Sequence, residues 1–124
     1  MKKKVIVSAA LALSLTVLLG VPASADSTAM SVGGCTIGCA SSWSGTSGVG
    51  VTTNGNSSIT CKVDSTLTSK KGSKYNYASK SDSATASVTV KIATPSGYTP
   101  KLFSSDHTAV YSGKSYTRST SVEK

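Results

Sequence analysis

Apolar and polar residues alternate strictly between Ser83 and Ala93. Every second position is apolar, with serine, threonine or lysine between; the apolar positions are Ala84, Ala86, Val88, Val90 and Ile92. A period of two is typical of a β-strand that buries one face and leaves the other in water. The β-branched residues of this stretch disfavour a helix and suit a pleated sheet. The stretch therefore predicts a half-buried strand and an all-β fold.

Shorter runs with similar patterns predict further strands at 43–53, 57–68, 74–79, 98–103, 107–111 and 115–122. In the second of these, Ile59, Cys61, Val63 and Leu67 are expected to point inward. Asn54-Gly55-Asn56 predicts a hairpin turn before that strand, and Ser112-Gly113-Lys114 predicts a three-residue hairpin loop. No helical period occurs after residue 25. The expected fold is a small antiparallel β-sandwich, with an immunoglobulin-like arrangement as one candidate.

The first 25 residues have the pattern of a secretory signal peptide. Lys2, Lys3 and Lys4 precede an uncharged run from Val5 to Val21, and Ala23-Ser24-Ala25 supplies the small residues of a cleavage site. A retained membrane anchor is the alternative, because an uncharged run of about 17 residues is near the lower limit for a spanning helix. The cleavage triplet favours a signal peptide, so contact with a membrane is expected only through this transient leader.

The residues after the leader have the length of one domain. We divide them into a segment rich in glycine, serine and threonine at 26–42 and a single β-sandwich domain at 43–124. The protein is therefore expected to be secreted, with its site of action outside the cell or at the cell surface.

The whole chain has a net charge of +8, from 13 basic and five acidic residues. Three of the basic residues lie in the leader, and the densest basic run in the rest is Lys70-Lys71-Gly72-Ser73-Lys74. Binding of nucleic acid requires a concentrated basic stripe with stacking aromatic residues, which this sequence lacks. The remaining charge is consistent with a weak attraction to anionic wall polymers or lipid surfaces, or with solubility alone.

Three cysteines, Cys35, Cys39 and Cys61, follow the leader. An exported chain with three cysteines forms at most one internal disulfide, and loop-closure entropy hardly separates the longer pairings. Cys61 shares the inward face of its strand, which favours a Cys39–Cys61 disulfide over Cys35–Cys61 or Cys35–Cys39. A metal or redox site is not expected, because histidine ligands and a two-residue Cys spacing are both missing.

The sequence shows no catalytic constellation. His107 is the only histidine and follows Asp106, but neighbouring residues of a strand point to opposite faces, and no Gly-x-Ser-x-Gly motif is present. The acidic residues are isolated, which argues against a glycosidase pair or a calcium loop. We therefore expect no enzyme, no cofactor and no metal.

Aromatic residues are the remaining candidates for a binding surface. The tyrosines, Trp43 and Phe103 are the kind of residue that fills cores and pairs across strands, but exposed together they would form a patch for carbohydrate or protein. The candidates are Trp43, Tyr98, Tyr111 and Tyr116.

With its leader, its alternating serine- and threonine-rich strands and its closing run Ser-Tyr-Thr-Arg-Ser-Thr-Ser at 115–121, the chain resembles small secreted all-β proteins of Gram-positive bacteria. That resemblance implies the fold and export but no functional residue. We expect a monomeric, non-enzymatic binding or surface-associated module, whose partner is an extracellular glycan, a cell-wall polymer or a protein. The alternative is a secreted cationic antimicrobial or toxin-like polypeptide, although the chain offers no amphipathic helix for that role.

Overall fold

The computed structural model describes residues 25–124, which form eight β-strands. The strands are β1 (Ala25–Val32), β2 (Cys35–Ser44), β3 (Ser47–Thr53), β4 (Thr60–Lys71), β5 (Lys74–Ala84), β6 (Val88–Ala93), β7 (Thr99–Tyr111) and β8 (Lys114–Glu123). The predicted signal peptide lies outside the described residues, apart from Ala25. Within residues 25–124 there is no helix long and apolar enough to cross a membrane.

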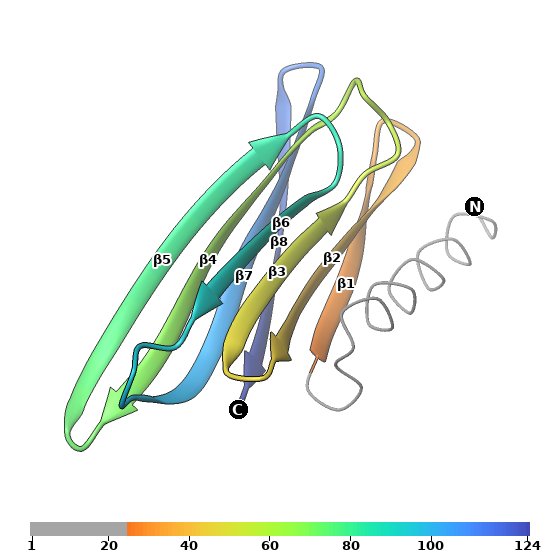
Figure 1. Cartoon of the computed structure of the whole chain (residues 1–124). Helices are drawn as coiled ribbons and strands as arrows, with labels where there is room; N and C mark the ends of the chain where they lie inside the picture. Colours follow the sequence, from red (N-terminus) through yellow and green to blue (C-terminus); the bar gives the residue numbers. More distant parts are fainter. Residues whose placement is uncertain (1–24) are drawn as a thin grey trace.

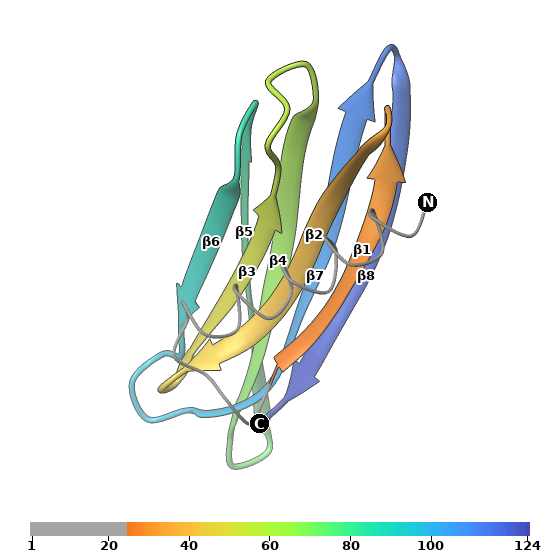
Figure 2. The ribbon, with the colours of Figure 1, turned by 90° about the vertical axis from the view of Figure 1, so that its right-hand side faces the viewer.

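The strands form two four-stranded antiparallel sheets that pack face to face (Figures 1 and 2). The first sheet has the order β1-β2-β3-β6 and the second the order β5-β4-β7-β8. Tight turns join β1 to β2, β2 to β3, β4 to β5 and β7 to β8, whereas the chain changes sheet after β3, β5 and β6. The predicted all-β, two-layer architecture is therefore confirmed.

Strands β4, β6 and β7 bury alternate residues between the two sheets. In and just before β4, the residues expected to point inward, Ile59, Cys61, Val63 and Leu67, have no exposed surface. In β6 the buried residues are Val88, Val90 and Ile92, as the sequence predicted. This agreement follows from the hydrophobic effect, because a period of two places one apolar row against the opposite sheet.

The Ser83–Ala93 stretch is not one strand, although its alternation is unbroken. β5 ends at Ala84, β6 begins at Val88, and the three residues between them carry the chain from the second sheet to the first. Ala86 is exposed. The alternation of alanine with serine and threonine thus extends through the segment that connects the two sheets. Only the valine and isoleucine positions mark a buried strand.

The predicted hairpin at Asn54-Gly55-Asn56 is wrong. β3 pairs with β2 and β6, whereas β4 pairs with β5 and β7, so these residues connect the two sheets. The side-chain amide of Asn54 donates to the carbonyl oxygens of Asn56 and Ile59, at 2.9 and 2.8 Å. An asparagine side chain that bonds to nearby backbone stabilises such a crossing as well as it does a hairpin turn.

Residues 26–42, for which the sequence predicted no strand, form β1 and most of β2. Their core residues include Met30, Val32 and Ile37, which are at most 5% exposed. The first sheet fills several other inward positions with small or polar residues, among them Ser41, Gly48 and Gly50, so its alternation is hard to see in the sequence. The β-sandwich therefore includes residues 26–42, and the predicted domain boundary at residue 43 is wrong.

Two predictions near the C-terminus also need correction. The expected strands at 98–103 and 107–111 are one continuous strand, β7, which lies between β4 and β8 and is not at an edge. The expected three-residue loop is a two-residue turn, because Lys114 already pairs with Tyr111. Ser112 and Gly113 both have positive φ, 51° and 78°, as the favoured two-residue hairpin turn requires.

Candidate functional site

A chain of buried polar side chains links the two sheets around His107. The imidazole Nδ1 shares a hydrogen bond of 2.9 Å with Thr52 of β3, and Nε2 shares one of 2.7 Å with Thr120 of β8. Thr120 bonds in turn to Ser41 of β2 at 2.6 Å. Both ring nitrogens of the buried histidine are thereby satisfied, which a buried polar group needs to avoid a large desolvation cost.

The same network continues through two further serines. Ser41 donates to Ser105 at 2.9 Å, and Ser105 shares a bond of 2.7 Å with Ser65 of β4. Burial lowers the pKa of His107 to about 4, which outweighs the opposing effect of the nearby carboxylates of Asp106 and Asp26. His107 is therefore neutral at physiological pH, and its hydrogen bond to Thr52 links the second sheet to the first.

His107 does not form a Ser/His/Asp arrangement with its neighbour in the sequence. Asp106 points to the outer face of the second sheet, where its carboxylate accepts a hydrogen bond from Ser119 at 2.6 Å. His107 has no exposed surface and bonds only to hydroxyl groups of threonines in the core. Among residues 25–124, no group of three or more His, Cys, Asp or Glu side chains is arranged to hold a metal ion.

The predicted Cys39–Cys61 disulfide is absent from the structure, in which all three cysteines are free thiols. Cys39 lies on β2 and Cys61 on β4, so they enter the core from opposite sheets, and both are at most 1% exposed. Burial raises the pKa of Cys39 to about 12, with a smaller contribution from Cys61, and burial also raises the pKa of Cys61. Their thiolates, the reactive form, are therefore scarce.

Thiol labelling checks this arrangement. With maleimide at neutral pH, we expect the folded protein to be modified only at Cys35, which is partly exposed, whereas denaturant should release all three thiols. Intact mass measures the number of adducts. One adduct after denaturation without reductant would instead show a disulfide, and three rapid adducts in the folded protein would contradict the burial of Cys39 and Cys61.

Trp43, the first of the predicted binding residues, belongs to the core. It is 2% exposed, its ring meets that of Phe103 edge to face at 6.1 Å, and its indole N–H donates to the backbone of Glu123. A ligand outside the sandwich has no access to this side chain. The residue instead anchors the end of β2 against the last strand.

The three predicted tyrosines do not form one patch. Tyr98 lies just before β7 and is half-buried, whereas Tyr111 is the last residue of that strand and packs against Gly33 in the β1–β2 turn. Tyr116, on the edge strand β8, is 37% exposed. Tyr111 and Tyr116 are diagonal neighbours on one face of the β7–β8 hairpin, but Tyr98 lies at the other end of β7, so the three tyrosines form no common surface.

An exposed aromatic pair lies on the β4–β5 hairpin instead. Tyr75 and Tyr77 are 55% and 67% exposed, and their rings stand 6.2 Å apart with an angle of 17° between their planes. Lys70, the partner of Tyr75 across the hairpin, holds its ammonium 5.1 Å from the centre of that ring. We call Lys70, Tyr75 and Tyr77 the tyrosine platform; its two tyrosines are the most exposed large apolar side chains among residues 25–124.

Comparisons with known proteins do not decide what the platform binds. No protein-family model matches the chain, and no curated protein is similar to it. The function must therefore be argued from the surface itself.

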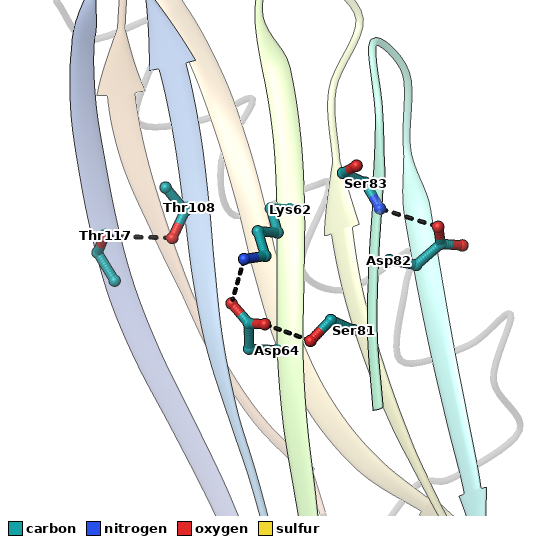
Figure 3. A network of polar contacts seen from close by, with 7 residues as sticks. All are labelled: Lys62, Asp64, Ser81, Asp82, Ser83, Thr108 and Thr117. Atoms are coloured by element: carbon teal, nitrogen blue, oxygen red, sulfur yellow. Dashed lines mark hydrogen bonds and ion pairs between the residues drawn. The ribbon is translucent and has the colours of Figure 1, made fainter. Parts of the chain in front are cut away.

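Hydroxyl groups continue the platform along the outer face of the second sheet. Thr66 and Ser79 share a hydrogen bond of 3.0 Å across β4 and β5, and Ser81 donates to the carboxylate of Asp64 (Figure 3). Lys62 forms an ion pair with the same carboxylate at 3.5 Å. Between the tyrosines and this pair, the outer face offers a polar strip that follows the two strands.

A sequence signal for the platform did exist. Tyr75 and Tyr77 are two residues apart in a predicted strand and thus share a face. Nothing in the sequence shows which face that is, because the β4–β5 hairpin continues beyond the core, where alternation no longer reports burial. Both rings lie on the outer face of the second sheet, and this placement follows from the strand pairing and not from the sequence.

Proposed function

We propose that the protein is a secreted, non-enzymatic binding module that holds an extracellular glycan on the outer face of its second sheet. The observation that carries this proposal is the exposed pair Tyr75 and Tyr77 at the end of a strip of hydroxyl groups. Flat aromatic faces stack against sugar rings, and hydroxyls and a carboxylate supply hydrogen bonds to sugar hydroxyls. Export rests on the signal-peptide pattern at residues 1–25, and action as a monomer, outside a bacterial cell, is part of the same proposal.

We also propose an immunoglobulin-like strand arrangement, in line with such a role. In that fold, strand B pairs with E in one sheet, and C, F and G are neighbours in the other. The pairs β3–β6, β4–β7 and β7–β8 correspond to B–E, C–F and F–G, and β5 takes the place of the additional strand C′. β1 then precedes strand A as an extra strand, and no strand of residues 25–124 corresponds to D.

Binding to polysaccharides tests the proposed function. We expect the purified protein to sediment with bacterial cell walls or with an insoluble polysaccharide, and the Tyr75→Ala/Tyr77→Ala variant to bind at least about tenfold more weakly. Tyr116→Ala is the matched control, because it removes an exposed tyrosine from a strand outside the platform. Circular dichroism of each variant verifies that the fold is intact.

Three results would contradict this function. Equal binding by the platform variant and by the Tyr116→Ala control would remove the platform from the interaction. No binding to any wall or polysaccharide would reject a glycan ligand. Inhibition of bacterial growth at low micromolar concentration, without glycan binding, would favour the antimicrobial alternative.

A further inference from the structure

We propose that the glycan is a polyanion, whose carboxylate or phosphodiester groups are bound by the lysines at the end of the β4–β5 hairpin. This inference rests on the proposed function and adds the charge of the ligand. The hairpin end consists of Lys70, Lys71 and Lys74 with the two tyrosines of the platform. In both overall views, its turn projects furthest of all the segments at that end of the molecule (Figures 1 and 2).

The lysines of the hairpin end have no negative partner among the described residues. Lys71 and Lys74 are direct partners across the two strands, and Lys70 is adjacent in the chain. The only ion pair within residues 25–124 joins Lys62 to Asp64, further along β4. Like charges placed directly opposite in a hairpin destabilise it, so this arrangement lowers stability unless a bound anion compensates.

The positions of the charges relative to the rings fit a charged sugar chain. The Lys70 ammonium lies over the Tyr75 ring. A sugar that stacks on the tyrosine platform would therefore lie next to this positive charge. Lys71 extends to the other side of the hairpin, where its ammonium lies close to Gly97 in the turn before β7. A polymer that passes over the rings and around the projecting end meets all three charges, whereas a neutral polymer gains only from the rings.

Paired polymers of different charge test this inference. Polygalacturonate supplies carboxylates, poly(glycerol phosphate) supplies phosphodiesters, and dextran is neutral. We expect at least one of the polyanions to bind about tenfold more tightly than dextran in about 0.1 M NaCl, with most of the difference lost in about 1 M NaCl, where the Debye length is about 3 Å. Which polyanion binds distinguishes a carboxylate-bearing from a phosphate-bearing glycan.

Two triple variants, each lacking three positive charges, separate the effect of the hairpin lysines from the effect of the protein's net charge. Lys70→Gln/Lys71→Gln/Lys74→Gln should lower the affinity for the polyanion about tenfold, because three charge contacts near the surface that are individually weak act together. Lys91→Gln/Lys114→Gln/Arg118→Gln removes three exposed charges elsewhere and should change it less than twofold.

The outcomes also separate this inference from the proposed function. Equal losses in the two triple variants, or equal affinity for dextran and both polyanions, would overturn the anionic ligand. If the tyrosine variant still reduced binding in that case, the glycan-binding function would stand. Equally tight binding to phosphatidylglycerol vesicles, insensitive to the tyrosine variant, would overturn both in favour of a lipid surface.

Discussion

Replacing Gly48 with alanine should destabilise the protein by about 3 kcal/mol or more, as judged from overpacked cores. A Cβ atom at this position would stand 1.9 Å from Cδ1 and 2.4 Å from Cγ of Phe103. Phe103 has no exposed surface and packs edge to face against Trp43, so its ring has no free space to move into. Urea denaturation measures the effect as a lower urea concentration at the midpoint of unfolding. The effect should be easy to detect, because the total free energy of unfolding of a domain of this size is small.

Gly55→Ala is the matched control for this experiment. A Cβ atom there has no neighbour within 4 Å, so we expect stability to change by less than about 0.5 kcal/mol. Combining Gly48→Ala with Phe103→Leu should restore part of the lost stability, since the smaller side chain vacates the space that the methyl group needs. If the two substitutions were simply additive, the clash would not be the cause.

The second large effect should appear on acidification. His107 has a pKa of about 4 in the folded protein and the ordinary value of 6.5 when the chain is unfolded, so the unfolded state binds the proton more tightly. Its contribution to stability is therefore complete above about pH 6.5 and is progressively lost as the pH falls toward 4. At 1.36 kcal/mol per pH unit, the total loss is about 3 kcal/mol.

His107→Gln isolates this contribution from that of the carboxylates. Glutamine is polar but does not titrate, so the variant should be less stable than the natural protein at pH 7, where the hydrogen bonds to Thr52 and Thr120 are disturbed. Between pH 6.5 and 4, however, its free energy of unfolding should fall less steeply. Parallel curves for the two proteins across this range would show that His107 is not the group responsible.

Sequence reasoning succeeded where large apolar residues alternate and failed where small ones do. Val63, Leu67, Val90 and Ile92 were assigned correctly to the core, because burying such side chains gives a large gain in free energy. The inner face of the first sheet relies on Gly48, whose missing side chain accommodates Phe103 from the opposite sheet. Complementary packing of this kind depends on both partners, and a pattern within one strand does not reveal it.

Prediction of the candidate site was limited in a different way. The basic run Lys70–Lys74 and the nearby tyrosines are visible in the sequence, but the aromatic pattern predicts binding residues elsewhere. Trp43 is an aromatic residue of the kind found at binding surfaces, yet in this fold it fills the core. Exposure of an aromatic residue depends on strand order and on where each sheet ends, and both are properties of the tertiary structure.

The chain changes sheet after β3, β5 and β6, and these changes affect how fast it folds. The four hairpins join neighbouring segments, but β3 must find β6 and β4 must find β7, so that Thr52 meets Val88 and Val63 meets His107. Closing such distant pairings is slow, typically milliseconds to seconds for all-β domains. A polypeptide that folds at this pace stays unfolded for milliseconds to seconds after synthesis, a state that the export proposed above would require.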